Sequence, residues 1–154
     1  MYVRRFLLSA VVCAGIMTVS SSSTFAQGTP LFAALNGGNE VNGAGVARSG
    51  DLDGFGSATV NFSNITATTA TLCYAVLVSN ITAATAAHIH RGTSGVNGPI
   101  VVNFTPPVGN PGRIAGCTTI SRVLYSQLIA LPSAFYVNVH NAAFPAGAVR
   151  GQLF

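Results

Sequence analysis

The chain of 154 residues contains no tryptophan and no lysine, and charged residues make up only 6% of it. Its seven cationic side chains are therefore all arginines, and the five that follow the N-terminal pair are scattered along the sequence rather than clustered. Proteins that bind nucleic acid usually carry a basic patch or stripe, so this composition argues against nucleic acid as a partner. Acidic side chains are scarcer still, since the chain has only Glu40, Asp51 and Asp53.

The N-terminus has the pattern of a secretory signal peptide. Arg4 and Arg5 precede an apolar run of 14 residues, 6–19, and a serine-rich stretch that ends at Ala26 follows. This order of charge, apolar core and small residues is typical of an export signal. The run is shorter than the roughly 20 residues that span a bilayer, so we expect no transmembrane anchor. We predict that residues 1–26 are removed near Ala26 and that the protein is secreted, periplasmic or held at the cell envelope.

Cysteine is also scarce, with three residues in the chain. Cys13 lies in the apolar run and should be lost with the signal peptide. Cys73 and Cys117 remain, in a compartment where thiols oxidise. They are too far apart in sequence for a CxxC redox or zinc motif. We therefore predict a single disulfide between Cys73 and Cys117.

The remaining chain reads as one all-β domain. Alternation of Ala58, Val60 and Phe62 with polar residues predicts a strand with one wet face. The next run, residues 69–78, is apolar at almost every position, which predicts a central strand buried on both faces. Short strands separated by glycine and proline continue to the C-terminus. The fold class that we expect is an antiparallel β-sandwich or Greek-key barrel with one short helix.

That helix is predicted between Ser121 and Leu131. Leu124, Leu128 and Leu131 fall on one face at helical spacing, Ser121 can cap the first turn, and Pro132 ends the helix.

Three histidines are the most informative side chains. His88 and His90 are two residues apart on a predicted strand, so both point to one face. In the strand FYVNVH, Phe135 and Val139 belong to the core-facing set, while His140 belongs to the other. If the two strands are neighbours, three imidazoles converge as ligands for one copper or zinc ion with an open coordination position. Otherwise they form a solvated or hydrogen-bonded surface feature.

Other chemistry has weaker support in the sequence. After the disulfide forms, no cysteine is free to act as a nucleophile, and no serine lies in a nucleophile-elbow motif. Asp51 and Asp53 could form a calcium-binding turn, but they supply too few oxygens for the six to eight ligands that calcium prefers. A solvated turn is the simpler interpretation. Four glycosylation sequons are present, and they matter only if the host glycosylates.

Two sequence blocks carry a resemblance to a known family. They are AAHIHRGTSGVNGPIVV at residues 86–102 and AFYVNVHNAAFPAGAVRGQLF at residues 134–154. With GNEV at residues 38–41, they make residues 30–154 resemble the CHRD domain, a module first named in chordin. This resemblance implies a compact extracellular all-β module without a defined activity. The chain lacks the cysteine-rich domains that accompany the module in chordin, so growth-factor binding is not transferred.

The histidines also resemble the copper site of copper/zinc superoxide dismutases. That family has a histidine-x-histidine pair on one strand, a third copper ligand on a later valine-rich strand, and then an arginine. His88, His90, His140 and Arg150 follow the same order. The remaining zinc ligands are missing, so this resemblance implies at most a mononuclear copper site, with Arg150 attracting a small anion.

We therefore expect a non-enzymatic extracellular binding or envelope-associated module, whose partner is an unidentified protein or surface component. The alternative is a mononuclear copper redox protein that resembles superoxide dismutase. A third hypothesis, glycan binding by the glycine-rich loop 92–98, has few aromatic residues to support it.

Overall fold

The structure is a computed structural model that describes residues 29–154. The predicted signal peptide, residues 1–26, lies outside the described residues. Nine strands form one antiparallel sheet, in the order β5-β4-β8-β9-β1-β2-β3-β7-β6. The strands are β1 (Leu31–Asn36), β2 (Phe55–Ser63), β3 (Thr69–Ser79), β4 (Ala84–Arg91), β5 (Ile100–Phe104), β6 (Val108–Gly109), β7 (Gly112–Ser121), β8 (Phe135–Asn141) and β9 (Val149–Gln152).

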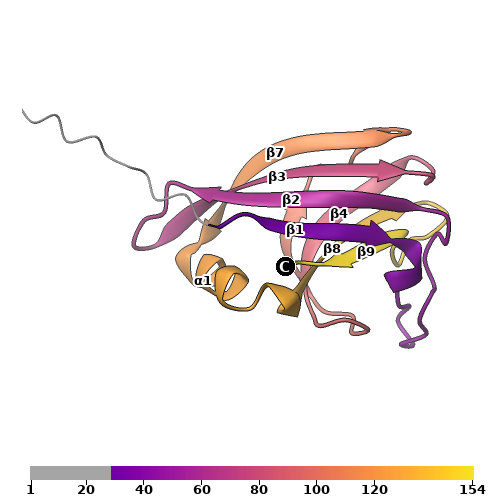
Figure 1. The fold of residues 1–154 in the computed structure, drawn as a ribbon, viewed down its shortest axis with the longest axis horizontal. Coiled ribbons are helices and arrows are strands. Elements are labelled where there is room, and N and C mark those ends of the chain that lie inside the picture. Colours follow the sequence, from indigo (N-terminus) through magenta and orange to yellow (C-terminus); the bar gives the residue numbers. More distant parts are fainter. Residues whose placement is uncertain (1–28) are drawn as a thin grey trace, which may run out of the picture.

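The sheet curls over on itself, so that strands from its two halves face each other across the core (Figure 1). Tyr74 of β3 and Phe104 of β5 stack with their ring centroids 3.9 Å apart, although their strands are far apart in the sheet order. The backbone amide of Thr105 donates to the Tyr74 hydroxyl at 3.0 Å. The all-β prediction with one short helix is thus confirmed. The two layers that pack against each other are the two halves of a single curled sheet.

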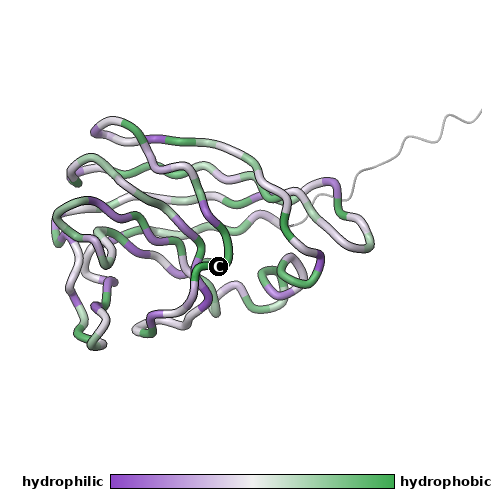
Figure 2. The backbone as a smooth tube through the Cα atoms, turned by 180° about the vertical axis from the view of Figure 1, so that it is seen from behind, coloured by the Kyte–Doolittle hydropathy of each residue, from purple (hydrophilic) through white to green (hydrophobic). Residues whose placement is uncertain are grey.

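The core is lined by one face of each long strand. Ala58, Val60 and Phe62 of β2 are buried, as their alternation predicts. Along the strands, hydrophobic and hydrophilic residues alternate (Figure 2). Each large aliphatic or aromatic side chain removed from water contributes about 1.5–3 kcal/mol, so this inner face supplies most of the stabilisation.

The helix α1 (Arg122–Ala130) begins and ends close to the predicted residues and covers one end of the core (Figure 1). The Ser121 hydroxyl accepts a hydrogen bond from the Leu124 amide at 3.1 Å, as expected for an N-cap. Leu128 is fully buried, whereas Leu131 is 57% exposed. Leu131 does not continue the helical face of Leu124 and Leu128 as its spacing predicts, because it follows the last helical turn and its backbone has left the helical conformation. A short 3-10 turn, η2 (Pro132–Ala134), follows.

Two further predictions need correction. Strand β3 is buried on one face only, and Leu77 on its other face is 54% exposed. The apolar residues there lie on the outside of the curled sheet rather than between two layers. Strand β1 is not among the predicted strands, although its buried residues Leu31, Ala33 and Leu35 alternate with exposed ones at the strand period. Within residues 29–154, no helix is long and apolar enough to cross a membrane.

Two loops cover the face of β4, β8 and β9 that points away from the core. One is residues 37–54, which begins with the 3-10 turn η1 (Gly37–Asn39) and lies at the end of the molecule opposite α1 (Figure 1). The other, residues 92–99, connects β4 to β5. The side-chain amide of Asn97 joins the two loops by donating to the carbonyls of Val41 and Asn42, at 2.9 and 2.8 Å.

Candidate metal centre

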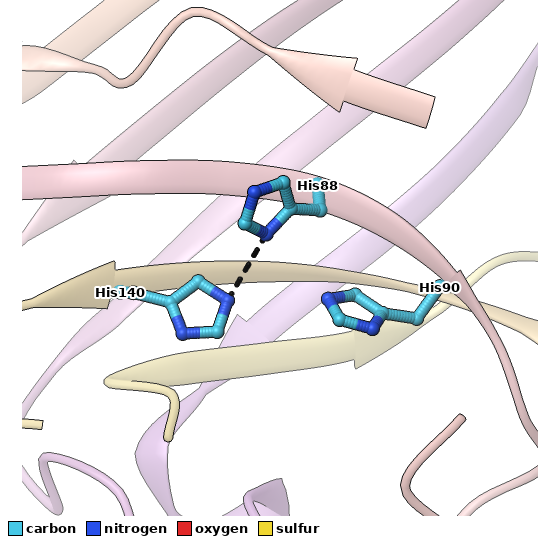
Figure 3. Close-up of side chains that lie close together, drawn as sticks. All are labelled: His88, His90 and His140. Carbon is cyan, nitrogen blue, oxygen red and sulfur yellow. Dashed lines mark hydrogen bonds between the residues drawn. The ribbon is translucent and has the colours of Figure 1, made fainter. Parts of the chain in front are cut away.

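The three histidines meet on the loop-covered face of the sheet. Strands β4 and β8 are antiparallel neighbours, and His140 lies opposite Ala86 while His88 lies opposite Asn138. This adjacency is the condition on which the three-histidine hypothesis depended. One ring nitrogen from each histidine lies within 4.8 Å of the others, and Figure 3 shows the rings converging from the two strands. We call His88, His90 and His140 the histidine cluster.

Backbone carbonyls determine which ring nitrogen carries the proton on two of these histidines. His90 Nδ1 lies 2.9 Å from the carbonyl oxygen of Gly98, and His140 Nδ1 lies 3.1 Å from that of Pro145. A carbonyl oxygen can only accept, so both Nδ1 atoms donate. In a neutral imidazole the other nitrogen is then unprotonated. The Nε2 lone pairs of His90 and His140 are thus left for another partner.

The remaining contacts within the cluster follow from these tautomers. His140 Nε2 lies 3.2 Å from His88 Nδ1, which must therefore donate to it. His90 Nε2 is buried and has no hydrogen-bond partner among the described residues. A buried acceptor without a partner is costly. The cluster therefore has one lone pair that is unsatisfied and a second that is used by a neighbouring imidazole.

The environment keeps all three imidazoles neutral. The pKa of His88 is lowered to about 4, chiefly by burial and further by the nearby His140 and His90. Burial also lowers the pKa of His90, against the opposing effect of its hydrogen bond to Gly98, and repulsion from His140 and Arg150 adds to the lowering. The pKa of His140 is lowered by burial as well. Neutral imidazole is the form that binds a metal ion.

The geometry of the cluster comes close to what one ion requires. Two nitrogens on a tetrahedral ion with bonds of 2.0–2.1 Å lie about 3.3 Å apart, and His88 Nδ1 and His140 Nε2 are already 3.2 Å apart. The widest pair would have to close by at most about 1.5 Å, given the 4.8 Å limit. Carbonyl acceptors on the far nitrogens are the outer contacts that orient ligating histidines. The donor set thus fits one copper or zinc ion.

Arg150, for which the sequence suggested an anion-attracting role, lies beneath the loops and is 1% exposed. Its guanidinium carbon lies 3.4 Å from the centroid of the Tyr136 ring. Its NH groups donate to the backbone carbonyls of Thr93 and Val96 and to the side chains of Asn97 and Gln152. An anion from solvent would have to displace these contacts, so the position of Arg150 gives no support to that role.

Sequence analysis gave no role to Glu40, which is fully buried in the same layer. Burial raises its pKa, and interactions with the Val41 amide, Arg150 and Asn138 oppose that effect. Its Oε2 has no hydrogen-bond partner among residues 29–154. Glu40 could have been singled out as one of only three acids in the chain, but the sequence has no periodic signal that places it under a loop.

The other predicted residues lie apart from the histidine cluster. Asp51 is partly exposed and Asp53 is exposed, in keeping with a solvated turn. Cys73 and Cys117 lie directly opposite each other on β3 and β7 and are joined by the predicted disulfide, with their Cα atoms 4.0 Å apart. Among residues 29–154, no second group of three potential metal ligands comes together.

Comparison with known families identifies the family of this chain. The family model of the CHRD domain matches residues 31–153, a span that includes all nine strands and all three histidines. No curated protein and no solved structure matches the chain. The resemblance noted in the sequence blocks around the histidines is thus confirmed. The chain belongs to the CHRD domain family.

Proposed function

We propose that this protein is an extracellular binding module whose histidine cluster holds one copper or zinc ion. The observation that carries the proposal is the pair of carbonyl contacts at His90 and His140, because they leave both Nε2 atoms unprotonated on the inner side of the cluster. In the absence of an ion, the lone pair of His140 Nε2 accepts a hydrogen bond from His88 Nδ1, and the lone pair of His90 Nε2 has no partner among the described residues.

Binding of the ion would replace the hydrogen bond between His88 and His140. His88 would make Nδ1 available as a ligand by exchanging its proton from Nδ1 to Nε2 through solvent, so the imidazole stays neutral. His90 and His140 would bind through Nε2 without a change of tautomer. The metal would supply a positive centre with a coordination position left over for an external group.

The extracellular location is supported by three features. CHRD domains are extracellular modules, the Cys73–Cys117 bond is typical of an oxidising compartment, and the first 26 residues have the pattern of an export signal. Acting outside the cell, the module would contact another protein or a surface component.

The metal content of the purified protein tests the proposal. The protein is stripped with a chelator, exposed to Cu²⁺ and Zn²⁺, and assayed by elemental mass spectrometry next to a His88→Ala/His140→Ala variant. We expect about one ion per chain in the unmodified protein, because one set of three ligands is available, and none in the variant. Thr119→Ala, at an exposed position on β7, is the control and should bind as the unmodified protein does. Weak binding that the double variant shares would contradict the proposal.

A mononuclear copper redox protein is the second candidate. It is favoured by the donor set, since three imidazoles leave a position where a small oxidant or reductant can reach the ion. A superoxide-consumption assay on the copper-loaded protein separates the two candidates. Turnover that disappears in the double variant would favour the redox protein, whereas tight copper binding without turnover would favour the binding module.

A further inference from the structure

The tautomer of His90 depends on the position of one loop, residues 92–98. The carbonyl oxygen of Gly98 accepts from His90 Nδ1 and so leaves Nε2 facing the other two imidazoles (Figure 3). Gly98 approaches the end of β4 so closely that a Cβ atom would lie 1.5 Å from the carbonyl oxygen of Arg91. A glycine at this position thus allows the loop to dock on β4, and other residues must hold it there.

Arg150 holds this loop from below. One terminal nitrogen, NH2, lies 2.9 Å from both the Thr93 and the Val96 carbonyl oxygens, and the other, NH1, lies 3.2 Å from Asn97 Oδ1. A buried guanidinium is costly to desolvate unless its donors are satisfied. Three of its contacts go to loop 92–98, so hydrogen bonds to this loop offset most of the desolvation cost of the guanidinium.

A second connection runs from Arg150 to His90 through Tyr136. The guanidinium lies over the Tyr136 ring. The same ring stacks on the imidazole of His90, with the ring centroids 4.8 Å apart and an angle of 7° between the planes. The Tyr136 hydroxyl also accepts from the Gly98 amide at 3.2 Å. Tyr136 therefore contacts both the imidazole and the residue that orients it.

Asn97 fixes the outer side of the same loop. Its side-chain oxygen accepts from Arg150, and its nitrogen donates to the carbonyls of Val41 and Asn42 in the loop that follows β1. Unlike Arg150, Asn97 is exposed. Its side chain can therefore be removed without opening a cavity in the core.

We infer that Arg150 and Asn97 are positioning residues for His90, which act by holding loop 92–98 so that Gly98 keeps the Nδ1 proton and Nε2 faces the ion. The expected effect of these residues on metal binding rests on the proposed function. The arrangement differs from the anion-attracting arginine that the superoxide dismutase resemblance implied. Here the arginine would act on the protein's own backbone.

The test compares Asn97→Ala and Arg150→Lys with Arg113→Lys, an exposed arginine on β7 that serves as the control. Copper affinity is measured by chelator competition, and the Cu²⁺ electron paramagnetic resonance spectrum is recorded for each protein. Loss of outer contacts to a ligating histidine weakens metal binding about 10–100-fold. We expect about tenfold weaker binding and an altered spectrum for Asn97→Ala, at least as much for Arg150→Lys, and no change for Arg113→Lys.

A measurement without metal keeps this inference separate from the proposed function. The ¹⁵N chemical shifts of the imidazoles in the metal-free protein report the tautomer of each histidine. We expect His90 to be protonated at Nδ1 in the unmodified protein and to become a mixture of tautomers in Asn97→Ala. An unchanged His90 tautomer in Asn97→Ala would overturn the inference, even if Arg150→Lys fails to fold. If the unmodified protein binds no ion, the proposed function fails. The histidine tautomers would still show whether Arg150 and Asn97 position His90.

Discussion

The two faces of β8 are both shielded from water, yet they differ in chemistry. On the inner face, Phe135, Val137 and Val139 pack into the apolar core. On the outer face, Tyr136 and Asn138 are as well buried, but they lie beneath loops and beside polar side chains.

Unsatisfied polar atoms distinguish the outer face. The inner face of β8 is apolar except at its last residue, Asn141, whose buried side-chain nitrogen has no hydrogen-bond partner among the described residues. The outer layer contains His90 Nε2, Glu40 Oε2 and Asn138 Oδ1, all buried and without a hydrogen-bond partner among the described residues. Each such atom costs about 1–3 kcal/mol. The comparison teaches that the inner face stabilises the fold. The outer face lowers the stability, because it buries polar groups without partners, and these groups are suited to bind a ligand.

The largest expected effect on stability comes from the inner face. Phe135→Ala removes a fully buried aromatic ring and leaves a cavity, so we expect the free energy of unfolding to fall by about 3–5 kcal/mol. Urea unfolding followed by circular dichroism measures this loss. A loss under about 1 kcal/mol would break the comparison, because the inner face would then not be the main source of stability.

Next in size is the disulfide, which lies on the outer side of β3 and β7, away from both buried faces of β8. Replacing Cys73 and Cys117 with serine should lower the free energy of unfolding by about 2–4 kcal/mol, chiefly by freeing the unfolded chain. Urea unfolding of the reduced and oxidised unmodified protein provides the control. The metal content of this variant should stay that of the unmodified protein; a loss would show that the histidine cluster depends on this distant part of the sheet.

A smaller effect is expected at Gly147, in the turn between β8 and β9. Its φ of 145° is one that other residues rarely adopt, and a Cβ there would lie 2.2 Å from Glu40 Oε2. Gly147→Ala should therefore cost about 1–3 kcal/mol in backbone strain and disturb the outer layer. Ala143→Gly, an exposed position in the same connection, is the control for loop flexibility. Unchanged stability and unchanged His140 chemical shifts in Gly147→Ala would contradict the prediction.

The smallest effect at neutral pH is expected for His88→Ala/His140→Ala in the metal-free protein. Its stability should be lower than that of the unmodified protein by about 1–2 kcal/mol, because the change removes two neutral hydrogen bonds, from His88 to His140 and from His140 to the Pro145 carbonyl. Urea midpoints at pH 7 measure this difference.

The same variant should separate from the unmodified protein in acid. The folded pKa of each histidine is below the unfolded value of about 6.5, so the unfolded chain binds more protons as the pH falls. The histidine contribution is thus complete above about pH 6.5 and is lost on going down towards the folded pKa of His88, about 4. The unmodified protein should lose more stability than the double variant between pH 7 and 4.5. Parallel losses would show that the cluster is not buried as described.

Much of the fold could be predicted from local pattern. The alternation in β2 and β8, the serine cap and leucine spacing of α1, and the pairing of the two remaining cysteines all depend on neighbours in sequence or on residue count. Strand β1 carries the same signal, but it is short and runs directly into a glycine-rich loop, so the sequence around it does not read as a strand. The outer face of β3 was mispredicted because an apolar run does not reveal whether a second layer covers it.

For the candidate site, the sequence by itself determined that His88 and His90 share one face of a strand and that His140 faces away from the core, since side chains alternate along any strand. Only the tertiary structure decided that β4 and β8 are neighbours, that two loops bury Arg150 and Glu40, and that the carbonyls of Gly98 and Pro145 orient the imidazoles. These contacts join residues that the chain brings together through long-range strand pairing and loop packing. A local periodicity carries no information about such pairings, so the histidines could be found in the sequence while their chemical environment could not.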